Sequence, residues 1–207
     1  MAKIISFISR KGGTGKTTNA INLATMMHSL GHRLILIETD TNYTLNTLRK
    51  MEVFRTGAKD EILFKILGSE NEELVDEIEK LKSNGKLDFI LVDSAGKTTD
   101  ESIKKLCLLS DVILVPTSLT QNDMLVTYQT IEDIKPAKKI NSELQILVLP
   151  NRIHTMTKIE TIRDALKELD ADILDIKVPS KKVFSSFSTI MPEKEYLDMT
   201  KEILRHV

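Results

Sequence analysis

The sequence predicts an α/β protein with a doubly wound, mainly parallel β-sheet flanked by helices. Short apolar runs alternate along the chain with stretches of helical periodicity. The runs lack the polar alternation of a half-exposed strand, which indicates strands buried on both faces, as in parallel sheets. A glycine-rich loop directly follows the first run and precedes a helical pattern. In such sheets ligands bind beyond the carboxyl ends of the strands.

Each element can be assigned in order along the chain. The apolar runs predicted as strands are 4–8, 34–37, 89–92, 112–115 and 146–149. The helical patterns cover 17–30, 71–82, 101–109, 122–134 and 157–169, with a last helix from Glu193 onward after Pro192. The segment 52–67 is ambiguous, because its apolar part at 62–67 fits either an extra strand or a short helix. Right-handed crossovers should then place helices on both faces of the sheet.

Length and composition predict one domain. A chain of 207 residues, 41% of them hydrophobic, is long enough for one sizeable core and too short for two substantial domains. No repeat or Pro/Gly/Ser-rich linker divides residues 1–207. The formal net charge of -1 selects neither nucleic acid nor an anionic membrane as partner, so any such surface must be local.

The same properties indicate the compartment. The single cysteine, Cys107, cannot form an intramolecular disulfide, and the N-terminal residues lack a signal-peptide pattern. No apolar stretch approaches the roughly 18 residues that a membrane-spanning helix requires. We therefore expect a soluble, cytoplasmic protein.

A phosphate-binding loop lies between the first strand and the first helix. Its residues are Lys11, Gly12, Gly13, Thr14, Gly15, Lys16, Thr17 and Thr18. Glycines let backbone N–H groups turn inward around phosphate oxygens, and the helix N-terminus adds partial positive charge. We expect Lys16 to contact the β- and γ-phosphates and the Thr17 hydroxyl to bind Mg²⁺. The plainer alternative is a glycine-rich turn with a solvated lysine.

The loop also carries a second lysine, since Arg10 occupies the position of the usual first glycine and Lys11 follows it. Here the chain resembles the deviant Walker ATPases, whose K-G-G-x-G-K-T signature is complete from Lys11 to Thr17. In that family the first lysine reaches across a dimer interface to the partner's nucleotide. The resemblance implies a P-loop NTPase of this subclass, ATP as the nucleotide and an ATP-dependent homodimer. Alternatively, Lys11 is an exposed loop lysine without a role.

Acidic residues end the second predicted strand. In the resembled family this segment reads Asp-x-Asp-Pro-Gln, and its second aspartate orients the attacking water. Asp40 matches that aspartate, whereas Glu38 and Thr41-Asn42 depart from the pattern and put the hydrolysis rate in doubt. The resemblance implies Lys11, Lys16 and Asp40 as the catalytic set, with Asp40 also near the metal. A plain helix cap is the alternative for Asp40.

The apolar run at 89–92 ends in Asp93, which makes a Walker B pattern. Many buried strands end in aspartate as a turn residue, so this pattern gains its weight from the phosphate-binding loop. We expect Asp93 to hold Mg²⁺ through water. Gly96 and the polar run at 97–100 resemble a second switch loop that moves with the γ-phosphate.

Residues in the last third of the chain are candidates for binding the adenine base of the nucleotide. Asn151 and Arg152 follow the strand predicted at 146–149, and the Asn151 amide offers donors and an acceptor for an adenine edge. Relatives often bind adenine with Asn-Arg at this strand end, and Pro179 lies in a loop that matches a base-lining family segment. Asparagine after a strand is as commonly a turn residue.

A lysine cluster, Lys177, Lys181 and Lys182, stands in a region where DNA-binding relatives use basic residues. Nearby acids make a solvated charged face an equal alternative.

Within the deviant Walker group, the chain is most similar to small ParA-type DNA partition ATPases of the ParF and VirC kind, without an N-terminal DNA-binding domain. The resemblance covers nearly the whole chain, including the run 112–123 with its proline and aspartate-headed helix. It implies that ATP dimerises the protein, that the dimer binds non-specific DNA and so associates with the nucleoid, and that a ParB-type centromere-binding protein stimulates hydrolysis and release.

Other classes fit less well. A MinD-like membrane-positioning ATPase needs a basic amphipathic tail, whereas the terminal helix has the apolar spread of a core-docked helix, so membrane binding is not expected. A nitrogenase-iron-protein-like reductase needs more thiolates than one cysteine per chain supplies. A dethiobiotin-synthetase-like ligase shares the fold, but no substrate-pocket signature is recognisable. An ATP-gated scaffold with negligible turnover is the non-enzyme alternative.

Overall fold

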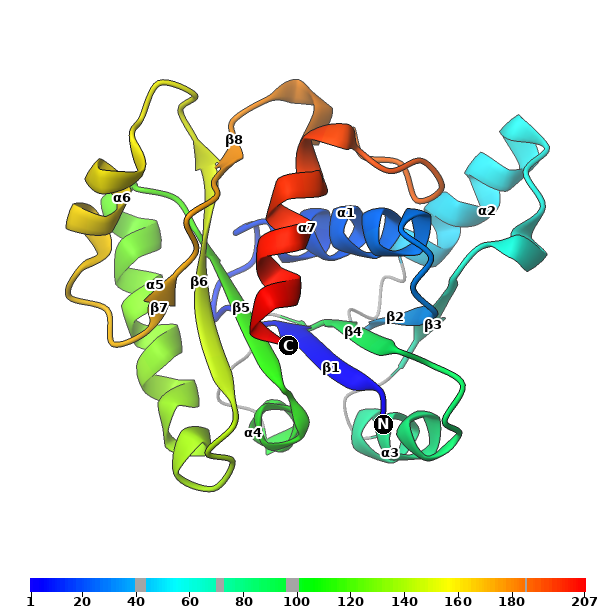
Figure 1. Ribbon diagram of the computed structural model, residues 1–207, viewed down its shortest axis with the longest axis horizontal. Helices are drawn as coiled ribbons and strands as arrows, with labels where there is room; N and C mark the ends of the chain where they lie inside the picture. Colours follow the sequence, from blue (N-terminus) through cyan, green and yellow to red (C-terminus); the bar gives the residue numbers. More distant parts are fainter. Residues whose placement is uncertain (40–43, 70–72, 96–100, 185) are drawn as a thin grey trace.

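The computed structural model describes residues 1–39, 44–69, 73–95, 101–184 and 186–207 (Figure 1). Within these ranges the strands form a parallel sheet in the order β3-β2-β4-β1-β5-β6-β7, and β8 pairs with β6. The strands are β1 (Lys3–Phe7), β2 (Leu34–Glu38), β3 (Lys65–Gly68), β4 (Phe89–Asp93), β5 (Val112–Thr117), β6 (Gln145–Ile153), β7 (Asp172–Ile173) and β8 (Val178–Pro179). The predicted α/β class and parallel sheet are confirmed.

Helices cover both faces of the sheet (Figure 1). One face packs against α1 (Lys16–Ser29), α2 (Thr44–Thr56) and α7 (Leu197–Ile203). The other packs against α3 (Leu74–Ser83), α4 (Glu101–Leu109), α5 (Gln121–Ile134) and α6 (Ile159–Leu166). Short 3₁₀ turns are η1 (Asp60–Ile62), η2 (Lys135–Lys139), η3 (Lys182–Phe184), η4 (Lys194–Tyr196) and η5 (Leu204–His206). Successive residues of β1, Ile4 and Ile5, enter opposite cores, which is why this strand reads as a continuous apolar run.

The path of the chain reverses beside β1. It runs from β1 to β2 and β3, returns through β4, and crosses to β5 on the other side of β1. The carboxyl end of β1 is thus a topological switch point, where open α/β sheets bind ligands. Strand register also aligns three strand ends, because Asp93 pairs with both Phe7 and Glu38.

Several elements differ from the sequence prediction. The ambiguous run at 62–67 contains the strand β3. Helix α2 was missed because its buried positions include the charged residues Arg49 and Glu52, which mask its amphipathic pattern. Strand β6 continues to Ile153, and the two-residue strands β7 and β8 were too short to predict. The terminal segment is helical as expected, beginning with η4 and continuing as α7.

Candidate functional site

The glycine loop joins β1 to α1 at the switch point. Gly13 and Gly15 have left-handed φ values of 78° and 97°, which glycine adopts without the steric cost that other residues incur. A Cβ added at Gly15 would lie 2.3 Å from Nδ2 of Asn151, whereas one added at Gly12 or Gly13 would meet no atom within 4 Å. The loop is therefore packed against the protein at Gly15 and open on the side of Gly12 and Gly13.

Buried side-chain amides hold the loop carbonyls. Asn151 Nδ2 on β6 donates to the Thr14 carbonyl at 2.8 Å, and Asn19 Nδ2 donates to the Gly15 carbonyl at 2.7 Å. The Tyr196 hydroxyl in turn donates to Asn19 Oδ1 at 3.0 Å. Burial raises the pKa of the Tyr196 hydroxyl, so it stays protonated and remains a donor. The loop is thus braced by segments from the middle and the end of the chain.

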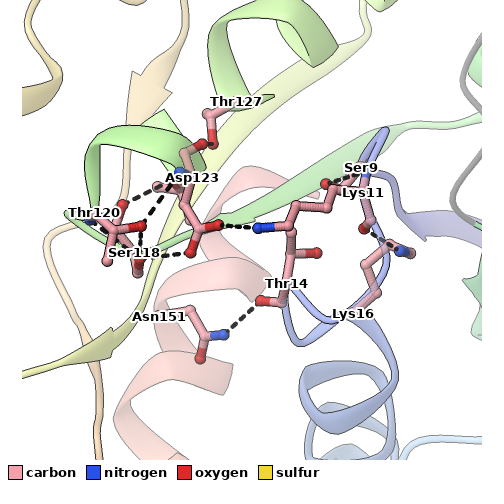
Figure 2. A network of polar contacts seen from close by, with 10 residues as sticks. Ser9, Lys11, Thr14, Lys16, Ser118, Thr120, Asp123, Thr127 and Asn151 are labelled. Carbon is pink, nitrogen blue, oxygen red and sulfur yellow. Dashed lines mark hydrogen bonds and ion pairs between the residues drawn. The ribbon is translucent and has the colours of Figure 1, made fainter. Parts of the chain in front are cut away.

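Lys16 and Lys11 take different directions from the loop (Figure 2). Lys16 is buried, and its Nζ donates back to the Lys11 carbonyl at 3.2 Å. The Lys11 side chain is 43% exposed, and its Nζ forms an ion pair with Asp123 Oδ1 at 3.1 Å. One ammonium group therefore lies against the loop backbone, and the other lies at the surface beside α5.

Asp123 is fixed from several sides (Figure 2). Ser118 Oγ donates to its Oδ2 at 2.6 Å, and its backbone N–H donates to Oγ1 of Thr120, the N-cap of α5. The Ser118 hydrogen bond first and the Lys11 ammonium second lower the pKa of the Asp123 carboxyl, which stays ionised at neutral pH. Sequence reasoning did not assign Asp123 as the partner of Lys11. Its sequence signal is the T-x-x-D cap at the start of α5.

Asp93 ends β4 beside β1, and its side chain is buried. Glu38, at the same level on β2, accepts the Leu45 N–H at 3.1 Å to each carboxylate oxygen. That carboxylate therefore anchors the start of α2. Thr39 Oγ1 accepts the Ala95 N–H at 2.8 Å and ties the two strand ends together. Asp40, Thr41-Asn42, Gly96 and residues 97–100 lie outside the described residues.

A cavity of about 470 Å³ adjoins the loop. It is lined by Gly15, Thr18, Asn151, Arg152, Pro179, Ser180, Lys181, Lys182 and Phe184. The residues predicted to contact adenine thus lie together with the loop. Asn151 is inside β6 rather than in a turn, is buried, and commits its Nδ2 to the Thr14 carbonyl. Arg152 is exposed and has a left-handed φ of 57°, which is uncommon for a non-glycine residue and recurs at functional sites.

The three lysines that lie close together in the sequence have different partners in the structure. Lys177 Nζ donates to the carbonyls of His154, Thr155 and Thr157, so it closes the turn after β6. Lys181 forms an ion pair with Glu195 at 2.6 Å, and Lys181 and Lys182 line the cavity beside the glycine loop. The sequence could not reveal this, because the three carbonyls and the cavity come from segments whose approach depends on β6–β8 pairing.

Comparison with known proteins assigns the family. The family model described as "VirC1 protein" matches residues 2–205. The chain belongs to the VirC1 family. This confirms the resemblance to ParA-type ATPases of the VirC kind. The chain is 27% identical to protein virC1 of Rhizobium rhizogenes over 180 residues, which are 86% of this chain and 75% of that protein.

Solved structures share the fold of this VirC1-family chain. A plasmid partition protein from Borrelia burgdorferi aligns with a TM-score of 0.71 and 21% identity, covering 100% of this chain and 99% of that one. Cobyrinic acid a,c-diamide synthase from Mycobacterium smegmatis, solved with bound ADP and magnesium, aligns with a TM-score of 0.73 and 17% identity, covering 100% and 95%. A partition protein and a biosynthetic enzyme thus have the same architecture, so the fold alone does not decide the activity.

Within the described residues, no helix combines the length and the apolar character needed to cross a membrane.

Proposed function

We propose that this protein is a Mg²⁺-dependent partition ATPase that dimerises when it binds ATP. The observation that carries the proposal is the divergence of the two loop lysines. Lys16 lies within the loop, where it can meet the phosphates of its own nucleotide. Lys11 extends to the surface, and its ammonium group forms an ion pair with Asp123 that is partly exposed to solvent, so this group can move to a nucleotide on a second subunit.

The residues present fit a nucleotide and a metal ion. The open side of the loop at Gly12 and Gly13 leaves room for phosphates, and the adjoining 470 Å³ cavity is of a size for a nucleoside. Mg²⁺ prefers oxygen ligands and keeps several waters. Thr17, in the first turn of α1, and Asp93, at the end of the adjacent strand β4, supply a hydroxyl and a carboxylate for it. Bound Mg²⁺ would offset the negative charge that develops on the phosphates.

For the base, Arg152 and Pro179 are the stronger candidates. The Asn151 Nδ2 already donates one of its two hydrogens to the loop, and its side-chain oxygen can accept from an exocyclic amine. We propose that Asn151 couples the base to the loop, while Arg152 and Pro179 cover the base.

Water orientation is assigned to Asp40, on the resemblance alone. The neighbouring acid, Glu38, is already engaged at the N-terminus of α2, which removes it as an alternative base. We propose that hydrolysis releases the dimer and that a ParB-type centromere-binding protein accelerates this step.

The proposed cargo is DNA bound without sequence preference. Lys182 provides positive charge beside the cavity, as does Lys181, whose ion pair with Glu195 is exposed to solvent; dimerisation would double the number of phosphate contacts on one surface. Lys177 is left out, because its ammonium group is occupied by backbone carbonyls.

The test is a filter-binding assay with unrelated DNA duplexes at low salt, with ATP, with ADP and without nucleotide, run beside flotation with anionic liposomes. We expect ATP-dependent DNA binding that Lys11→Ala abolishes while ATP binding persists. Binding to liposomes and not to DNA would replace the proposal with a MinD-like membrane role. Binding to neither would favour a ligase, and an ATP-bound dimer without turnover would favour a scaffold.

A further inference from the structure

A second cavity, of about 940 Å³, lies between α2 and the segment 186–191. Its large apolar lining residues are Leu48, Met51, Phe54, Phe187, Ile190 and Met191. Phe54 is 92% exposed, Met191 69% and Met51 65%. Side chains of this size exposed together around a hollow are typical of a binding surface rather than of scattered surface residues.

The walls of this groove are held by a buried polar network. Glu52 Oε2 accepts the Thr189 N–H at 2.7 Å and also the Thr189 hydroxyl. Arg49 donates to Thr189 Oγ1 at 3.1 Å and to the Thr189 carbonyl at 2.6 Å, and its guanidinium lies 4.6 Å from the Phe64 ring centroid. Buried charged groups that are hydrogen-bonded in this way favour one arrangement of the two walls. The groove is therefore pre-formed.

The exposed charge on the groove lining is positive. It belongs to Arg55 on α2, whereas Lys59, beyond α2, is followed at once by the exposed acids Asp60 and Glu61 and adds no net positive charge. Along α2, all of which the structure describes, the acidic residue is Glu52, and its carboxylate is buried and bonded to Thr189. The segment 186–191 carries no charged residue. A carboxylate on a ligand in the groove would thus be attracted by Arg55, the exposed charged residue of the lining.

We infer that this groove binds an amphipathic segment of a partner protein whose apolar side chains are flanked by carboxylates. The concave shape fits inserted side chains, whereas a bilayer is better met by a protruding apolar surface. The aromatic and methionine lining fits protein side chains. A nucleic acid bound through its phosphates alone would leave that apolar surface without contacts.

Both walls are connected to the nucleotide site. Helix α2 begins at the Glu38 carboxylate, next to the end of β4 that carries Asp93, and the segment 186–191 closely follows Lys182 and Phe184 of the nucleotide cavity. Partner and nucleotide should therefore influence each other's affinity by the same factor. This coupling rests on the proposed nucleotide function, while the docking itself does not.

The test begins with random 12-residue peptides displayed on phage and selected against the full-length protein without nucleotide. Recovered peptides are synthesised with a fluorescent label, and their affinity is measured by anisotropy. We expect sequences that combine aromatic or aliphatic residues with Asp or Glu. Phe54→Glu should weaken binding by at least about tenfold, the range of an aromatic hot spot. Because Phe54 is almost fully exposed, this substitution should leave the fold intact.

Ile140→Glu is the matched control, since Ile140 is 77% exposed and follows η2 in the connection between α5 and β6, two elements that Figure 1 shows on the opposite side of the molecule from α2. It should leave peptide affinity unchanged. Arg55→Glu should lower the affinity for acidic peptides. A peptide with lysine in place of its acidic residues should bind that variant with recovered affinity.

Peptides without acidic residues, or binding that is equal in the Phe54→Glu and Ile140→Glu proteins, would overturn the inference. The inference would also be overturned by a nucleotide-free dimer that Phe54→Glu disrupts, because a second copy of the chain would then occupy the groove. Binding to phosphatidylglycerol vesicles that depends on Phe54 would overturn it as well. Repeating the anisotropy measurement with ATP tests the coupling separately. A peptide affinity that is the same with and without ATP would contradict the coupling but not the docking site.

Discussion

The ion pair between Lys11 and Asp123 should restrain dimerisation, and Asp123→Asn should release that restraint. The substitution removes the charge, keeps the size of the side chain, and retains an oxygen that can accept from Ser118. In the proposed dimer Lys11 leaves this pair for the partner's nucleotide. Without the pair, this transfer costs less, so the variant should dimerise more tightly with ATP and Mg²⁺.

The magnitude follows from the exposure of the pair. The Nζ–Oδ1 distance is 3.1 Å, but the lysine side chain is 43% exposed and the aspartate side chain 18% exposed, so solvent screens the attraction. Pairs of this kind contribute at most about 1 kcal/mol. A dimer breaks the pair in both subunits, which amounts to about 2 kcal/mol and lowers the dimer Kd by up to about 30-fold. Raising the salt concentration should shrink this difference.

The assay is sedimentation equilibrium with ATP and Mg²⁺, with Asp133→Asn as the control. Asp133 pairs with Arg10 at 3.2 Å, so this control also loosens the same loop from the same helix without touching Lys11. If Asp123→Asn dimerises no more tightly than the parent, or no more tightly than Asp133→Asn, the reasoning is wrong.

The restraint should also be independent of pH near neutrality. The pKa of Asp123 is lowered from its ordinary value of about 3.9, so the pair is complete above that value and is lost only as the pH falls through the lower folded pKa. Dimer affinity should therefore not change through this group between about pH 6 and pH 8. A change that Asp123→Asn abolishes would contradict this.

Three further predictions concern the loop and its supports, and a fourth concerns the buried thiol of Cys107 in α4. Lys16→Ala should weaken ATP binding at least about 100-fold in calorimetry, because phosphate charge loses its ammonium partner; unchanged affinity would remove the loop from the site. Gly15→Ala should lower the free energy of unfolding in urea by about 2–3 kcal/mol, since φ is 97° and the added Cβ meets a buried amide. Tyr196→Phe should cost about 1–2 kcal/mol in the same assay by leaving Asn19 Oδ1 without its donor, and an unchanged midpoint would argue against that bond. Burial raises the pKa of the Cys107 thiol to about 12, so iodoacetamide at pH 8 should label only unfolded protein.

Local sequence patterns were sufficient for the five central strands, β1, β2, β4, β5 and β6, and for the loop. Strands buried on both faces are continuous apolar runs, and glycine spacing at 12–15 reports a backbone that must turn tightly after β1. Both signals are carried by neighbouring residues. Asp93 was also predicted at the carboxyl end of its strand, because that position follows directly from the end of the apolar run.

Helix α2 shows where such patterns fail. It buries Arg49 and Glu52. Because charged residues occupy buried positions, its pattern of apolar and charged residues is that of a solvent-exposed helix. The partner that makes this burial possible is Thr189, 137 residues away from Glu52 along the chain. No local window contains both residues, so neither the helix nor the groove beside it could be predicted.

The sequence by itself determined the fold class, the phosphate-binding loop and the strand end that carries Asp93. Only the tertiary structure decided which partners the functional side chains have. Lys11 is paired with Asp123, 112 residues away, and Asn151 is bonded to Thr14, 137 residues away, while Lys177 is turned onto backbone carbonyls. The physical reason is that backbone conformation and burial pattern are set by adjacent residues, whereas a hydrogen bond or ion pair forms between whichever groups the packed sheet brings within about 3 Å.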